Sequence, residues 1–167
     1  SQFEGAERLA EKYQLTREDT DGFGLQSQER AKAAIETGYF DSQIIPIEAP
    51  VMDENFERTD EIVSVNRDEV PRDTSLEALA QLKPVARQNG LHTAGTSSQI
   101  ADGAAAVLMM SASKAKALGL VPLATIRASA LVGCDPVIML EGPIPATQKM
   151  LEQTDLSIDD IDVFEVN

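Results

Sequence analysis

Residues 122–131 read PLATIRASAL, residues 143–151 read PIPATQKML and residues 162–167 read DVFEVN. The first and last are apolar runs typical of strands, and the middle one begins with prolines that suit the first turn of a helix. A strand, a helix and a second strand in this order predict a right-handed crossover, which is typical of a parallel or mixed sheet. The sequence therefore predicts an α/β fold.

The two ends of the chain predict that it is part of a longer protein. The run from Asp162 to Asn167 alternates like a buried strand and meets the last residue without a turn, polar tail or closing helix. At the other end, Ser1 to Gly5 has neither an initiator Met nor the basic and apolar regions of a signal peptide. We expect the chain to be an internal piece of that protein.

Composition limits the class of protein. Hydrophobic residues make up 43% of the chain and charged residues 25%, and no apolar stretch approaches the ~20 residues of a membrane helix. Acidic residues outnumber basic ones 28 to 14, which disfavours nucleic acid as a partner. A single cysteine and a single histidine argue against an internal disulfide and a structural metal. We therefore expect a soluble, cytoplasmic protein with no metal.

Two helices are predicted near the beginning of the chain. Apolar residues recur at helical spacing in residues 5–14, and good helix formers fill residues 17–34. Thr16 and Asp19 have the spacing of a capping box, and Gly38 suits the left-handed position that ends a helix.

Shorter elements are expected further along. Residues 43–47 are β-branched around a proline and predict an edge strand, after which the sequence is loop-like through residue 70. Leucines three residues apart in 76–82 predict a short helix, and another is expected from Ser111 or Ser113 to Gly119.

Small residues are concentrated in residues 93–103, which read TAGTSSQIADG. Gly, Ala and Ser let a ligand approach the main chain, while hydroxyls and backbone N–H groups supply uncharged hydrogen bonds. This pattern suits a flexible, amide-bearing ligand and matches neither a Walker loop nor a dinucleotide fingerprint. The alternative interpretation is a polar turn that enters a buried strand at residues 104–110.

Nine signatures in a fixed order resemble the thiolases, which join or split acyl groups on coenzyme A. They are Ala6-Glu7, Leu15 to Glu18, Ser27-Gln28, Phe40 to Pro46, Leu82 to Pro84, Thr93 to Ala106, Asp135-Pro136, Gly142 to Ala146 and Asp162 to Asn167. The resemblance covers essentially the whole chain.

The resemblance implies a truncated form of the five-layered αβαβα thiolase fold with a helical loop domain. Residues 1–92 would form most of the loop domain, which holds much of coenzyme A. Residues 93–121 would close the first thiolase half, and residues 122–167 would open the second.

The resemblance also implies an acyltransferase chemistry. Thiolases use a Cys nucleophile, a His that activates it, a second Cys that moves protons, and an Asn that positions a water in an oxyanion hole. Only the Asn has a counterpart in this chain, at Asn167. Cys134 and His92 match no catalytic position and are interpreted as structural. The missing groups are expected outside residues 1–167, so the chain alone should be inactive.

For the ligand, the resemblance assigns Ser98 to the pantetheine arm of coenzyme A, Ala94 and Ile100 to its walls, and Arg72 to the adenine nucleotide. Coenzyme A is a substrate, and no further cofactor is implied. The whole protein is expected to act on acyl-CoA or acetyl-CoA as a homodimer or homotetramer.

Two other classes of function stay open from the sequence. One is a non-catalytic, thiolase-like module that binds an acyl-CoA, sterol or lipid, and the other is a structural remnant without a ligand. A parent sequence lacking the nucleophilic Cys or the catalytic His would favour the binding module. The degradative or biosynthetic direction is also open.

Overall fold

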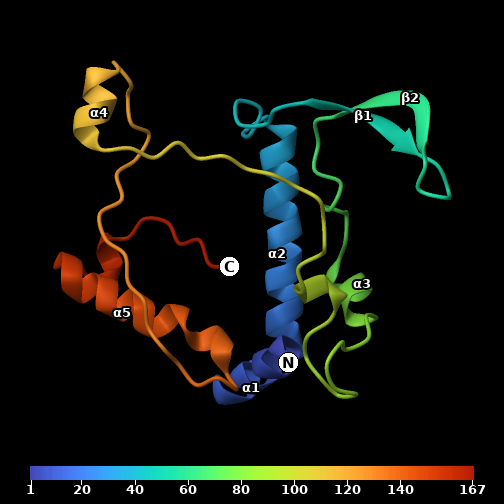
Figure 1. Cartoon of the computed structure of the whole chain (residues 1–167). Helices are drawn as coiled ribbons and strands as arrows, with labels where there is room; N and C mark the ends of the chain where they lie inside the picture. Colours follow the sequence, from blue (N-terminus) through green and yellow to red (C-terminus); the bar gives the residue numbers. More distant parts are fainter. The chain divides into compact units, whose positions relative to one another are not determined.

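The computed structural model describes all 167 residues, which form two compact units. One unit comprises Ser1–Leu15 together with Asp102–Asn167, and the other comprises Thr16–Ala101. Helices predominate in both units (Figure 1). None of them combines the length and the apolarity that crossing a membrane requires. The domain boundaries expected at residues 92 and 121 stay a prediction.

Helix α2 (Arg17–Glu36) is the longest element of the Thr16–Ala101 unit. The expected capping box is present, because the Thr16 hydroxyl accepts from the Asp19 N–H at 3.2 Å and the Asp19 carboxylate accepts from the Thr16 N–H at 2.8 Å. Gly38 follows the helix with a φ of +66°, a conformation that glycine adopts without strain. The predicted limits of this helix are confirmed to within two residues at its end.

Two short elements pack on α2. Helix α3 (Leu76–Ala80) begins at the expected cap, Ser75, and buries Leu79. The single 3₁₀ turn η1 (Ala94–Thr96) also contacts α2. Figure 1 shows α3 lying beside one end of α2.

The expected edge strand at residues 43–47 and the loop after it were wrong. The structure instead has a hairpin of β1 (Ile47–Met52) and β2 (Arg58–Val65), which pair antiparallel. The Asp53 side chain accepts from two main-chain N–H groups of the turn at 2.8 Å, and Phe56 has a φ of +61°. This side-chain-stabilised turn allows an acidic sequence to reverse direction and pair.

The other unit is built from short helical elements. They are α1 (Gln2–Lys12), α4 (Ala112–Ala117), η2 (Met139–Glu141), α5 (Pro143–Thr154) and η3 (Ile158–Asp160). Helix α1 packs on η2, where Ala10 is buried and Lys12 forms an ion pair with Glu141. The helices predicted after Ser111 and at Pro143 are therefore confirmed.

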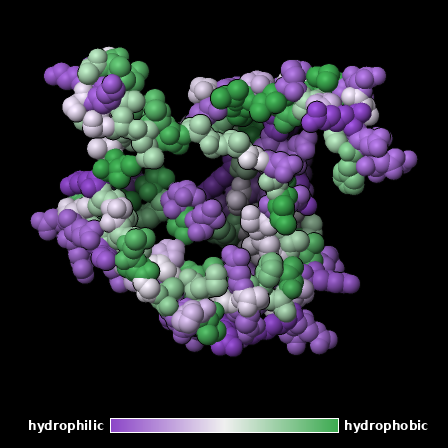
Figure 2. All heavy atoms as spheres, viewed as in Figure 1, coloured by the Kyte–Doolittle hydropathy of each residue, from purple (hydrophilic) through white to green (hydrophobic).

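The strands expected at residues 104–110, 122–131 and 162–167 do not form, so the crossover unit is present only as its helix. Their apolar side chains are exposed, with Leu131 at 91% and Val163 at 81%. A strand needs the main chain of a neighbour for its hydrogen bonds, and no segment of this chain pairs with them. Figure 2 shows hydrophobic side chains at the molecular surface.

Because these apolar segments are exposed, we expect the 167-residue chain to self-associate at micromolar concentration. Leu131→Glu should reduce this association, measured by light scattering and analytical ultracentrifugation. Gln153→Glu is the matched control, since it adds the same charge at an exposed polar site. A compact monomer at every concentration, with one cooperative unfolding transition, would contradict this expectation.

The capping box predicts a pH dependence. Hydrogen bonds from the hydroxyl and then the main-chain N–H of Thr16 lower the pKa of Asp19. The charged Asp19 carboxylate therefore stabilises the folded chain above the ordinary carboxyl pKa of about 3.9. This stabilisation is lost as the pH falls through the lower pKa that Asp19 has in the folded chain. Wild type should exceed Asp19→Asn in its urea midpoint at pH 7, and the difference should shrink below about pH 4. A difference that is constant with pH would exclude a role for the charge.

Candidate ligand-binding site

The turn from Thr93 to Ser97 is held by its own side chains. Thr93 is completely buried; its hydroxyl accepts from the Gly95 N–H at 3.1 Å, and its own N–H donates to the Thr96 hydroxyl at 3.1 Å. The Ser97 hydroxyl donates to the Thr93 carbonyl at 2.7 Å. Small hydroxyl residues therefore satisfy polar main-chain groups of the turn around the buried Thr93, as they commonly do in turns.

Glycines allow this turn to approach two helices closely. A Cβ at Gly95 would collide with Leu79 Cδ2 and lie 3.1 Å from Leu82 Cδ1. On α2, a Cβ at Gly24 would lie only 2.7 Å from the carbonyl oxygen of Gly95. Neither position has room for a side chain, so the turn is wedged between α2 and the α3 region.

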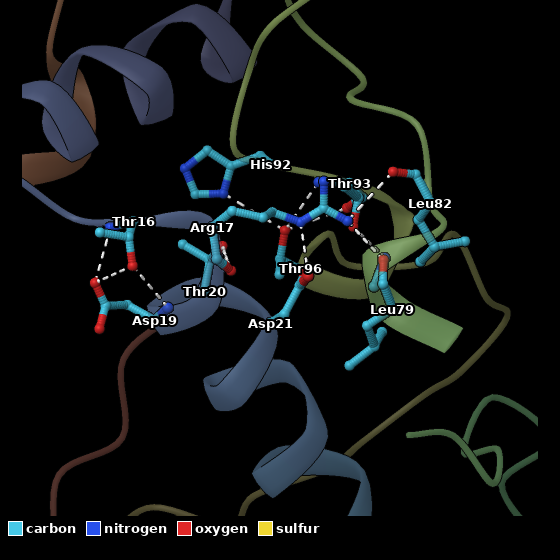
Figure 3. Close-up of polar contacts among 11 residues, drawn as sticks. Thr16, Arg17, Asp19, Thr20, Asp21, Leu79, Leu82, His92, Thr93 and Thr96 are labelled. Carbon is cyan, nitrogen blue, oxygen red and sulfur yellow. Dashed lines mark hydrogen bonds and ion pairs between the residues drawn. The ribbon is translucent and has the colours of Figure 1, made fainter. Parts of the chain in front are cut away.

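Arg17 links the first turn of α2 to the end of α3. Its Nε donates to Asp21 Oδ2 at 2.7 Å, and its Nη2 donates to the carbonyl oxygens of Leu79 at 2.6 Å and Leu82 at 3.2 Å (Figure 3). The guanidinium thereby adds a donor to the Leu79 carbonyl, which also accepts from the Leu82 N–H at 3.0 Å, and supplies a donor to the Leu82 carbonyl beyond the helix end. Asp21 is buried, and its second carboxylate oxygen has no partner.

Arg72 connects three segments of the same unit. Its N–H donates to Gln28 Oε1 on α2 at 2.9 Å, and its guanidinium donates to Gln99 Oε1 at 2.6 Å. A shallow hollow beside α2 is lined by Gln28, Lys32 and Arg72 among others. The guanidinium of Arg72 is therefore held by a neutral amide one residue beyond Ser98.

The four residues expected to bind a ligand all lie in the Thr16–Ala101 unit. Ala94, Ser98 and Arg72 are exposed, and Ile100 is 99% exposed. The structure brings Arg72 to the residue that follows Ser98, through the bond to Gln99. Three of them lie between Ala94 and Ile100, and Arg72 comes from a separate segment; the binding roles of all four stay predictions.

The expected catalytic residue lies in the other unit. Asn167 is exposed at the end of a segment without regular secondary structure. Cys134 is half-buried and its thiol donates to the Met139 carbonyl at 3.3 Å. His92 Nδ1 lies 3.5 Å from the Thr96 hydroxyl of the Thr93–Ser97 turn. No group of three or more His, Cys, Asp or Glu side chains is arranged to hold a metal ion.

Sequence reasoning missed Arg17, Asp21 and Gln99. The four-residue spacing of Arg17 and Asp21 at the start of a helix was visible, but such pairs are common on exposed helix faces. The other acceptors of Arg17 are the carbonyls of Leu79 and Leu82, which follow it by 62 and 65 residues in sequence. Gln99 gave no signal apart from its place in the small-residue segment.

Two models of one protein family together match nearly the whole chain. The sequence model described as "Thiolase, N-terminal domain" matches residues 4–113, and the one described as "Thiolase, C-terminal domain" matches residues 120–167. An acetyl-CoA acetyltransferase of Pseudomonas aeruginosa is 50% identical over 163 residues, which are 97% of this chain and 40% of that protein. A 3-ketoacyl-CoA thiolase of Idiomarina loihiensis is 49% identical, with 97% of this chain and 41% of that protein covered.

Solved structures agree with this assignment. The Bacillus anthracis acetyl-CoA acetyltransferase matches with a TM-score of 0.88 and 44% identity, covering 96% of this chain and 39% of its own. The human mitochondrial 3-ketoacyl-CoA thiolase matches with a TM-score of 0.85 and 40% identity, again covering 96% and 39%. The expected thiolase-like α/β fold is confirmed, and the chain spans about 40% of the length of its relatives.

The close approach of the Gly95 carbonyl oxygen to Gly24 predicts that substitutions at two glycines of α2 have opposite effects on stability. Gly24→Ala places a methyl group against a main-chain oxygen, so we expect it to lower the free energy of unfolding by about 1–3 kcal/mol. At Gly22 an added methyl group would meet no atom within 4 Å, so Gly22→Ala should raise that free energy by up to about 1 kcal/mol. Urea unfolding followed by circular dichroism measures both. Equal effects of the two substitutions would contradict the close approach.

Proposed function

Because the chain belongs to the thiolase family, we propose that it supplies the coenzyme A-binding loop and one oxyanion-hole residue of an acyltransferase. The reaction is transfer of an acyl group between coenzyme A and a cysteine, in 3-ketoacyl-CoA thiolysis or acetyl-CoA condensation. The observation that carries the proposal is the segment Ala94 to Ile100, which packs against α2 and the α3 region at Gly95, is bonded to Arg72 through Gln99, and exposes Ser98 and Ile100.

The chemistry of this segment matches the parts of coenzyme A. The exposed Ser98 hydroxyl is suited to a pantetheine amide, because it both donates and accepts a hydrogen bond. Ala94 is small enough for close approach, and the exposed Ile100 side chain offers an apolar wall. Arg72 provides a positive charge for the phosphoryl groups of the nucleotide. This local charge matters because the chain as a whole carries a net charge of −14.

In the proposed reaction, Asn167 holds a water that donates hydrogen bonds to the oxygen on which negative charge develops. The nucleophilic Cys, the activating His and the second Cys are supplied by residues outside this chain. Cys134, whose thiol is bonded to a main-chain carbonyl, takes no part in the chemistry. The 167-residue chain by itself therefore has no thiolysis activity.

The same proposal covers the whole enzyme. It acts on acyl-CoA or acetyl-CoA in the cytoplasm as a homodimer or homotetramer. Support for the substrates comes from the names of the relatives, an acetyl-CoA acetyltransferase and a 3-ketoacyl-CoA thiolase. The single cysteine of the chain is compatible with a reducing compartment.

The test uses a chimaeric enzyme in which this chain replaces the matched segment of the Pseudomonas aeruginosa acetyltransferase, 50% identical over that segment. In steady-state thiolysis, Ser98→Ala should raise the KM for coenzyme A by about 2–10-fold, the loss of one neutral hydrogen bond. Arg72→Ala should raise the KM and make it less sensitive to salt, because it removes a charge contact.

Ser64→Ala, at an exposed serine of the hairpin, is the matched control and should leave the kinetics unchanged. An unchanged KM in Ser98→Ala at every coenzyme A concentration would refute the ligand assignment. A chimaera that binds acyl-CoA but has no turnover, although its Cys and His are intact, would favour the non-catalytic binding module.

A further inference from the structure

A charged pair at the start of α2 joins a buried carboxylate to a half-buried guanidinium. The Asp21 side chain is 5% exposed and that of Arg17 is 26% exposed, with 2.7 Å between Nε and Oδ2. Removing two charges from water is costly even when they pair, so burial of the pair is weak evidence for a role in stability alone. The second Asp21 oxygen is also buried without a partner. The hydrogen bonds of the guanidinium indicate what this pair does.

The guanidinium bonds to protein groups through Nε and Nη2. Asp21 orients it from one side, while its Nη2 donates to the carbonyls of Leu79 and Leu82 from the other. It therefore fixes the end of α3 relative to α2. Since its bonds are directed into the protein, Arg17 has a different role from Arg72, whose guanidinium reaches the exposed Gln99.

The two leucines whose carbonyls Arg17 binds are those whose side chains contact Gly95. The carbonyl oxygen of Gly95 lies against Gly24 of α2. The position of the turn is thus set by the distance between α2 and the end of α3. That distance is the one that Arg17 bridges.

We infer that Arg17, oriented by Asp21, is the positioning residue for the segment Ala94 to Gln99. This inference rests on the proposed binding of coenzyme A by that segment. Arg17 does not touch the ligand or the reacting atoms. It determines where Ser98 and Gln99 are held, and hence the affinity for coenzyme A, while leaving the chemical step to other residues.

Two substitutions test this inference, one at Arg17 and one at Asp21. Arg17→Lys keeps the charge beside Asp21, but a single ammonium group cannot reproduce the planar set of donors that reaches three acceptors. Asp21→Asn keeps the shape of the side chain and removes the charge that orients Arg17. Arg30→Lys is the matched control, since Arg30 is an exposed arginine of the same helix.

The first measurement is amide hydrogen exchange in the ligand-free chimaeric enzyme that contains this chain. The Gly95 and Thr96 N–H groups are bonded within the turn, so both should exchange at least about 10-fold faster in Arg17→Lys than in wild type. Amides of the hairpin, such as that of Val63, should be unaffected. The second measurement is the KM for coenzyme A and the kcat of the chimaeric enzyme, where the KM should rise about 5–20-fold with kcat within about twofold.

The outcomes separate the two proposals. Unchanged exchange at Gly95 and Thr96 overturns the positioning role, as does a fall in kcat without a rise in KM. If exchange accelerates but the KM is unchanged in both Arg17→Lys and Ser98→Ala, the positioning of the turn is supported and its role as the coenzyme A site fails. Faster exchange throughout the chain in Arg17→Lys and in Asp21→Asn would reduce the pair to a purely structural role and overturn the inference.

Discussion

The guanidinium of Arg17 joins parts of the chain that few other interactions hold together. It bonds to a carboxylate on its own helix and to two carbonyls at the end of α3, 62 and 65 residues later. Few large side chains are buried in the chain, and Leu79 is the only leucine that is. With so little apolar burial to fix α3 on α2, directional charge-assisted bonds carry a larger share of the positioning than they do in a well-packed core.

The elements that Arg17 joins support a binding segment made of small residues. A turn that contains Ala, Gly, Thr and Ser has little side-chain mass with which to hold itself in place. Here the completely buried Thr93 closes the turn internally, and Gly95 and Gly24 permit contact with the helices on both sides. Because neighbouring elements support the turn rigidly, Ser98 and Gln99 are exposed and yet held in a defined position.

Three apolar segments are exposed because they have no partner strand in this chain. Residues 104–110, 122–131 and 162–167 have the composition of buried strands, yet they are unpaired in this chain. The backbone nevertheless matches that of an acetyl-CoA acetyltransferase with a TM-score of 0.88 over 96% of the chain. The chain spans only 39% of that structure, so partner strands from the remainder are consistent with the exposed surfaces.

The sequence by itself determined the features that depend on a few neighbouring residues. The capping box at Thr16, the left-handed Gly38 and the proline start of α5 were predictable because their hydrogen bonds and torsions are local. The ordered signatures likewise sufficed for the family and its α/β fold. Tertiary structure alone decided that Arg17 bonds to the Leu79 carbonyl, that Arg72 reaches Gln99, and that three strand-like segments stay unpaired. Each of these depends on which distant segments meet, and neither composition nor spacing encodes the presence of a partner.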